Sequence, residues 1–140
     1  MKFKDFIGIS ILSIVLATTA ANAQPSGALF QKEIVYFDFD AEQPTSKSAK
    51  TIEKIAKQLE ERPNLSIRLI GYADPTGDET YNMGLSQRRA ETCQKALIEL
   101  GVKPSRIFIE AKGEESILDI EENSHTERRR VEMIPILMKN

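Results

Sequence analysis

Strand-like and helix-like segments alternate along most of the chain, and this order constrains the fold more than any other feature. Apolar residues recur at helical spacing in residues 49–59 and again in residues 81–100. Segments rich in β-branched and aromatic residues lie before, between and after them, at 33–39, 65–72, 106–112 and 130–138. The sequence therefore predicts a β-α-β-α-β-β order, an α+β sandwich with two helices on one face of a four-stranded mixed sheet. Pro135 favours an edge position for the last strand.

The first 23 residues have the pattern of an export signal that is cleaved. Lys2 and Lys4 precede an apolar run at residues 6–16, and residues 21–23 read ANA, a cleavage pattern. The alternative is an uncleaved anchor, but the run is shorter than the ~20 residues that a spanning helix needs. Cys93 lies too far away for lipid attachment. We expect residues 1–23 to be removed, 24–32 to form a short leader and 33–140 to form one periplasmic domain.

The composition excludes several classes of function. Removing the two basic residues and one acidic residue of the signal from totals of 19 and 21 leaves 17 and 20, a net charge of −3. Nucleic-acid binding needs clustered cations, so no such partner is expected. One cysteine and one histidine are too few for a typical zinc site or an activated nucleophile. We expect no metal, no cofactor and no enzyme activity, and we expect Cys93 to be a core residue.

The second predicted helix places two neighbouring arginines on different faces. At about 100° per residue, Arg89 falls inside the apolar stripe of this helix and Arg88 falls on its polar face. Asn82 shares the face of Arg89. A guanidinium that faces a core requires an acidic partner or a route to solvent. Asp74, in the loop before the helix, is the nearest acid that follows a strand.

Two interpretations of Asp74 and Arg89 follow. One is a structural ion pair that closes the loop onto the helix, with Gly77 permitting a tight turn. The other is a small site for a zwitterion, in which the carboxylate binds an ammonium and the planar guanidinium donates two parallel hydrogen bonds to a carboxylate. Asn82 would add amide contacts. The helical geometry leaves both interpretations open.

The run GYADPTGDETYNMGLSQRRA, residues 71–90, resembles the central motif of OmpA-like peptidoglycan-binding domains. This family includes the C-terminal domain of outer-membrane protein A, the peptidoglycan-associated lipoproteins and the flagellar stator wall-binding domains. Residues 36–40 (YFDFD) resemble the first strand of the family. Its later landmarks are matched by residues 101–106, 113–114 and 129–132, so that the resemblance covers roughly residues 34–138.

The resemblance implies a non-catalytic module, residues 33–140, that binds the diaminopimelate of the peptidoglycan stem peptide. It assigns Asp74 to the ammonium and Arg89 to the carboxylate of that residue. The segment 36–40 would line the opposite wall, with Asp38 or Asp40 nearest. The residues expected to form the site are Asp38, Asp40, Asp74, Thr76, Asn82, Arg89 and Arg129.

The resemblance also implies a place and partners. The module would act in the periplasm at the cell wall, with the outer membrane as a candidate neighbour and an envelope protein or a second copy as a candidate partner. The alternative is a structural or interaction subunit of an envelope complex that keeps the fold without wall binding. Arg128 and His125 stand where the family often has asparagine and arginine, so the C-terminal rim of the pocket departs from the family pattern.

Overall fold

A computed structural model describes residues 30–114 and 125–138. The expected signal segment and residues 24–29 of the expected leader lie outside the described residues. The elements are β1 (Glu33–Tyr36), α1 (Ser46–Glu61), β2 (Leu65–Gly71), α2 (Glu79–Glu99), a 3₁₀ turn (Pro104–Arg106), β3 (Ile107–Ala111), α3 (His125–Arg128) and β4 (Arg130–Leu137). None of the helices in the described ranges combines the length and apolar composition that crossing a bilayer requires.

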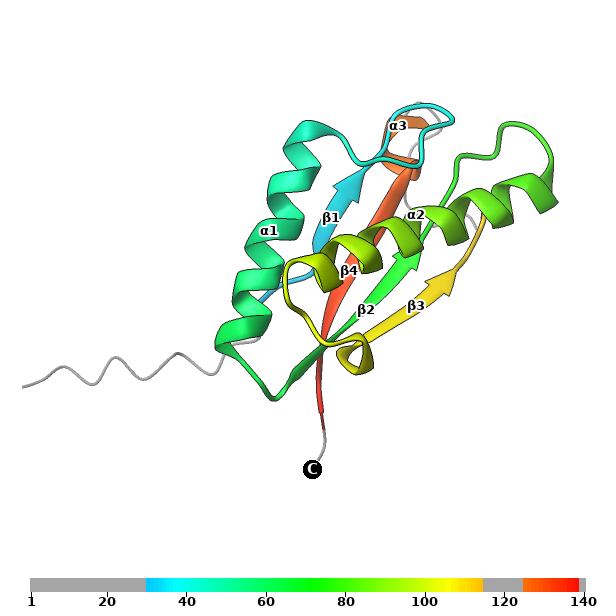
Figure 1. Cartoon of the computed structure of the whole chain (residues 1–140). Coiled ribbons are helices and arrows are strands. Elements are labelled where there is room, and N and C mark those ends of the chain that lie inside the picture. The colour runs from blue at the N-terminus through cyan, green and yellow to red at the C-terminus, as the bar shows by residue number, and fades with distance from the viewer. Residues whose placement is uncertain (1–29, 115–124, 139–140) are drawn as a thin grey trace, which may run out of the picture.

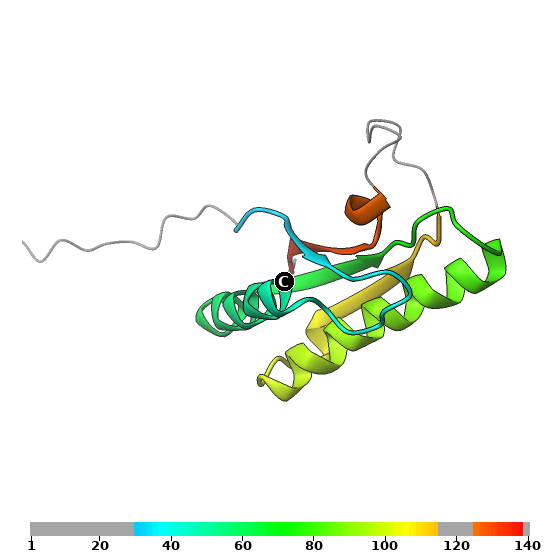
Figure 2. The same cartoon turned by 90° about the horizontal axis from the view of Figure 1, so that it is seen from above.

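The four strands form one mixed sheet in the order β1-β4-β2-β3. Both β1 and β2 pair antiparallel with β4, whereas β2 and β3 are parallel. Parallel neighbours need a long crossover connection, which α2 provides. α1 and α2 lie on the same face of the sheet, as the views in Figure 1 and Figure 2 show. The predicted α+β sandwich is therefore confirmed.

The expectation that Pro135 puts the last strand at an edge is wrong. β4 lies between β1 and β2. However, β1 pairs with β4 only from Arg130 to Met133, so Pro135 lies beyond the end of β1. In this stretch β4 pairs with β2 alone, and proline is accommodated where the ladder toward β1 has already ended.

Local capping decides where the two long helices begin. Thr45 caps α1 by accepting a hydrogen bond from Ser48 N at 3.3 Å. Asp78 caps α2 by accepting from Tyr81 N at 2.9 Å, so the helix begins at Glu79, two residues before the predicted start. β1 ends at Tyr36 rather than at residue 39. Residues 37–45 therefore form a loop over the end of the sheet.

The core lies between the sheet and the two long helices and is mostly aliphatic. Cys93 is fully buried there, and burial raises the pKa of its thiol to about 12. It is a core residue, as predicted. Phe30 is also buried, and Lys32 pairs with Glu132 at 3.5 Å, so residues 30–32 already contact the domain.

Candidate ligand-binding site

β1 and β2 end, and α2 begins, at one end of the sheet (Figure 1). Most of the predicted site residues lie together there. A small hollow of about 40 Å³ lies there, and we call it the site hollow. Its lining residues are Phe39, Asp40, Asp74, Thr76, Tyr81, Asn82, Leu85 and Arg89. Five of the seven predicted residues are among them, whereas Asp38 and Arg129 are not.

Gly71 allows α2 to approach β2 closely enough to form this hollow. A Cβ atom on Gly71 would lie 2.0 Å from the carbonyl oxygen of Ser86 in α2, so only glycine fits. The next turn of α2 then brings Arg89 against the end of β2. Sequence reasoning missed the role of Gly71. Its position inside an apolar strand was the available signal, because glycine there often marks a close backbone approach.

Arg89 is fully buried and donates hydrogen bonds to three backbone carbonyl oxygens. Nε donates to Ala41 at 2.9 Å, Nη1 to Tyr72 at 3.1 Å and Nη2 to Asp38 at 3.2 Å. A guanidinium has five N–H groups, so one on each terminal nitrogen has no partner among the described residues. Burial and the charge of Arg129 lower the pKa of Arg89 to about 10, which leaves it charged at neutral pH. Arg89 therefore places a positive charge beside the site hollow.

Arg88 lies on the outer face of α2, so the prediction that the two arginines differ is confirmed. Its side chain is 40% exposed and pairs with Glu42. Its guanidinium also lies 5.7 Å from the centre of the Tyr81 ring. Arg88 is thus a half-exposed surface residue with partners, rather than an isolated solvated charge.

Asp74 is nearly buried, and its carboxylate is held by Thr76 and Arg129. Oδ1 accepts from Thr76 N at 3.1 Å and from Thr76 Oγ1, while Oδ2 accepts from Arg129 Nη1 at 3.3 Å. Burial raises the pKa of Asp74, but these hydrogen bonds and the charge of Arg129 outweigh it and hold the pKa below its ordinary value of 3.8. Asp74 is therefore ionised at neutral pH.

The structural ion pair between Asp74 and Arg89, one of the two interpretations of the sequence, is wrong. Among the described residues, Asp74 pairs with Arg129, whereas Arg89 contacts three carbonyl oxygens and the Phe37 ring. The charge of Asp74 still acts on Arg89, because it raises the pKa of that guanidinium. The acid and the guanidinium thus line one hollow without forming an ion pair with each other.

Asn82 holds the loop before α2 in place. Its Nδ2 donates to Thr76 O at 3.1 Å and to Glu114 Oε2 at 3.0 Å, which uses both of its N–H groups. Its Oδ1 has no hydrogen-bond partner within the described ranges. Of the amide contacts that the sequence suggested, only the acceptor side of Asn82 is free for a ligand. Glu114 was not predicted, since it follows β3, 32 residues away.

The structure distinguishes Asp40 from Asp38. Asp40 lines the site hollow, and its carboxylate accepts a hydrogen bond from the Tyr81 hydroxyl. Its φ of 53° is a left-handed conformation that aspartate tolerates better than most residues. Asp38 contributes its backbone carbonyl to Arg89 and lies outside the hollow. Asp40 is therefore the acid of this loop that can face a ligand.

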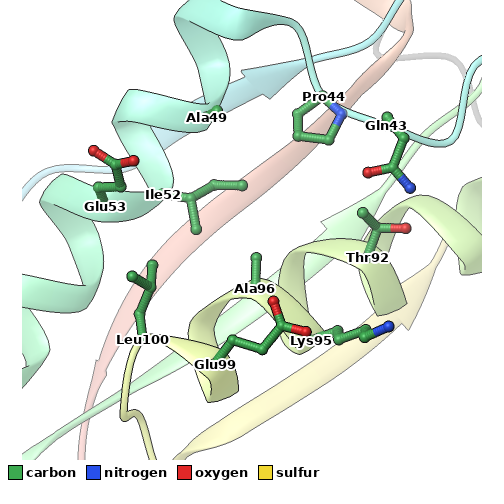
Figure 3. A pocket seen from close by; sticks show the side chains of 10 residues that line it. All are labelled: Gln43, Pro44, Ala49, Ile52, Glu53, Thr92, Lys95, Ala96, Glu99 and Leu100. Carbon is green, nitrogen blue, oxygen red and sulfur yellow. The ribbon is translucent and has the colours of Figure 1, made fainter.

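A larger hollow of about 480 Å³ lies elsewhere, between α1 and α2 (Figure 3). Its floor is formed by Ala49, Ile52 and Ala96, and charged residues such as Lys95 lie at its edge. None of the predicted site residues lines it. Over residues 30–114 and 125–138, no group of three or more His, Cys, Asp or Glu side chains is placed to hold a metal ion.

Comparison with known proteins identifies the family. Residues 36–131 match the sequence profile of the OmpA family, which covers more than half of the chain. The chain belongs to the OmpA family. The resemblance drawn from residues 71–90 is thus confirmed, and the fold and the position of the motif at the site hollow agree with it.

Relatives and solved structures of the OmpA family support this assignment. The chain is 42% identical over 77 residues to the probable lipoprotein YiaD of Escherichia coli, covering 54% of this chain and 35% of the relative. It is 32% identical over 100 residues to the peptidoglycan-associated lipoprotein of Pseudomonas putida, covering 70% and 60%. The crystal structure of the peptidoglycan-associated lipoprotein from Burkholderia pseudomallei matches with a TM-score of 0.68 and 30% identity, over 74% of this chain and 89% of that one.

Two further facts limit what these relatives imply. The periplasmic domain of Helicobacter pylori MotB matches with a TM-score of 0.64 over 81% of both chains, but at 19% identity it supports the fold alone. The chain spans between 24% and 60% of the length of the first curated relatives. The similarity therefore concerns the OmpA-family domain, not the whole length of those proteins.

Proposed function

We propose that this OmpA-family domain binds peptidoglycan, without catalysis, through the diaminopimelate of the stem peptide. One observation carries the proposal: an ionised Asp74 and a buried, charged Arg89 with two spare N–H groups line the same hollow without pairing. Relatives that bear the name peptidoglycan-associated lipoprotein support the choice of polymer.

The chemistry of the site hollow suits an ammonium and a carboxylate on one carbon. Arg89 offers two N–H groups, which match the two oxygens of a carboxylate. Asp74 and the free Oδ1 of Asn82 offer acceptors for an ammonium. Diaminopimelate carries both groups at its side-chain end, whereas lysine at the same stem position keeps the amine and lacks the carboxylate. A diaminopimelate wall therefore satisfies Arg89, and a lysine wall leaves its N–H groups unpaired.

We propose further that the domain acts in the periplasm at the cell wall after removal of residues 1–23. The basic start, short apolar run and ANA pattern support this location. N-terminal analysis of the exported protein checks it, with a chain that begins at Gln24 as the expected result. A membrane-bound chain that retains Met1 would contradict it.

Binding isotherms with matched stem-peptide fragments test the function. We expect the diaminopimelate fragment to bind about ten- to a hundredfold more tightly than the lysine fragment, because the lysine fragment loses one charge-assisted hydrogen-bonding pair. Asp74→Asn should weaken binding of the diaminopimelate fragment. Arg88→Ala is the matched control one residue from Arg89, and we expect it to change binding free energy by less than about 0.5 kcal/mol.

Two outcomes would contradict this proposal. Equal affinity for the two fragments would remove the mechanism based on a zwitterion. A folded domain that binds neither fragment nor isolated peptidoglycan would favour the alternative, a structural subunit of an envelope complex.

A further inference from the structure

We infer that Arg129 determines specificity at the site: in the free protein it already supplies the positive charge that Asp74 needs, so the site selects its ligand mainly by the carboxylate. This inference rests on the proposed function and concerns the relative weight of the two recognised groups. It predicts that the ammonium of the ligand contributes less to affinity than its carboxylate does, although acidic groups line the hollow.

The two oxygens of Asp74 are occupied differently. Oδ1 accepts both the N–H and the hydroxyl of Thr76, and two hydrogen bonds fill the usual capacity of a carboxylate oxygen. Oδ2 accepts one hydrogen bond, from Arg129 Nη1 at 3.3 Å. An incoming ammonium therefore has to use Oδ2, where Arg129 is already paired.

Arg129 is fixed in this position by contacts outside the site hollow. Its Nε donates to Phe37 O at 3.2 Å, and its Nη2 donates to Thr126 Oγ1 at 3.3 Å. Its side chain is 14% exposed and does not line the hollow. Arg129 therefore approaches Asp74 from the side of β1 and α3 and stays nearby when a ligand enters. The ammonium therefore shares Oδ2 with Arg129 and has a like charge beside it.

Arg89 is in the opposite situation. Its three hydrogen bonds go to neutral carbonyl oxygens, and no ion pair joins it to any acid in the described residues. A buried guanidinium gains most from an anion that pairs with its remaining N–H groups. The free site thus already contains a cation for its acid but lacks an anion for Arg89. A ligand carboxylate supplies what is missing.

A cycle of ligand and protein variants tests the inference. The ligands are a diaminopimelate stem-peptide fragment, the same fragment without the side-chain amine, and the same fragment with the side-chain carboxylate amidated. The proteins are the mature chain, Arg129→Gln, the charge-retaining Arg129→Lys, and Arg106→Gln as a control arginine far from the hollow. Circular dichroism confirms folding, and calorimetry measures each affinity.

For the unchanged protein, we expect removal of the amine to weaken binding about threefold, as for a weak ion pair. Amidation of the carboxylate should weaken it about tenfold or more. Arg129→Gln should bind the unmodified fragment about threefold more tightly and the amine-free fragment as before, so the cost of removing the amine rises to about tenfold. Arg129→Lys and Arg106→Gln should behave like the unchanged protein.

Two results would overturn the inference while the proposed function stands. One is weaker binding of the unmodified fragment by Arg129→Gln with an unchanged cost of removing the amine, which would make Arg129 a direct contact of the ligand. The other is a larger cost for losing the amine than for losing the carboxylate in the unchanged protein. If neither ligand change alters the affinity of the unchanged protein, the proposed function itself fails.

Discussion

Arg89 and Arg106 each donate three hydrogen bonds to backbone carbonyl oxygens, and they do so at opposite ends of β2. Arg106 donates from Nε to Leu65 at 2.7 Å and from Nη2 to Leu59 and Arg62, both at 2.8 Å. Those carbonyls belong to the end of α1 and the start of β2. Leu59 O and Arg62 O already accept from the backbone N–H groups of Arg62 and Leu65, so Arg106 adds a second hydrogen bond to each and ties the end of α1 to the start of β2.

The surroundings of the two arginines differ. Arg89 shares the site hollow with the nearly buried, ionised Asp74. Arg106 borders a hollow of about 200 Å³, and the exposed Glu60 is the only acid among the described residues that line it. At both ends of β2, an arginine thus stabilises the fold by donating hydrogen bonds to carbonyl oxygens. We propose that a binding site arises only where the spare N–H groups of the arginine and a buried acid face the same hollow.

The largest expected effect is a loss of ligand binding when Arg89, but not Arg106, is replaced. Arg89→Met removes three hydrogen bonds from a fully buried group and should lower the free energy of unfolding by about 3 kcal/mol. It should also abolish ligand binding. Arg106→Met should destabilise the domain by about 2–3 kcal/mol and leave the affinity of the folded protein unchanged. Urea denaturation and binding isotherms measure both quantities, and loss of affinity in Arg106→Met would break the comparison.

The acids provide the next test. Asp74→Asn should lower affinity for the diaminopimelate fragment by about tenfold, because it removes the anion and leaves the charge of Arg129 unopposed. Glu60→Gln changes the same chemical group in the hollow beside Arg106 and should leave the affinity unchanged. Titration calorimetry measures the affinity of each variant for the diaminopimelate fragment. Equal losses in the two variants would mean that Asp74 acts only through the overall charge of the domain.

Gly77 and Gly101 allow a matched comparison of the loops that precede and follow α2. Gly77 and Gly101 have φ angles of +95° and +97°, and a Cβ atom on either would meet nothing within 4 Å. Alanine at either position should cost about 1 kcal/mol, from the left-handed conformation alone. Only Gly77→Ala should also weaken ligand binding, because Gly77 follows Thr76, which holds Asp74. Thermal unfolding and binding isotherms check this, and weaker binding in Gly101→Ala would contradict it.

The smallest expected effect is on the pH dependence of stability. The pKa of Asp74 lies below 3.8 in the folded protein, since contacts with Thr76 and Arg129 outweigh its burial. A lowered pKa stabilises the folded state above the pKa of the unfolded chain, and this stability is lost as pH falls through the folded value. The difference in stability between the unchanged protein and Asp74→Asn should stay constant from neutral pH to about pH 5. Below that pH it should change progressively. Urea denaturation as a function of pH measures it, and a change above about pH 5 would contradict the assignment.

Much of the fold and of the candidate site could be predicted from the sequence because the relevant signals are local. The separation of Arg88 and Arg89 follows from about 100° of helix rotation per residue. The caps at Thr45 and Asp78 use side chains within three residues of the groups they bind. The motif in residues 71–90 identified the family from contiguous sequence, and residues 36–131 confirm it.

Long-range pairing explains where the predictions from sequence were wrong. Pro135 indicated an edge strand, but the strand order depends on which segments pair after folding, and β1 is too short to reach Pro135. One of the two interpretations of the sequence paired Asp74 with Arg89, the inward arginine of the next helix. It pairs instead with Arg129, 55 residues away.

The sequence by itself determined the order of elements, the inward position of Arg89 and membership of the OmpA family. The tertiary structure decided which charges neutralise one another. Arg89 donates to carbonyls 17, 48 and 51 residues away, and these groups meet only because the sheet brings the ends of β1 and β2 together. Helical rotation and capping act over a few residues, whereas electrostatic pairing depends on distances that exist only after the chain has packed.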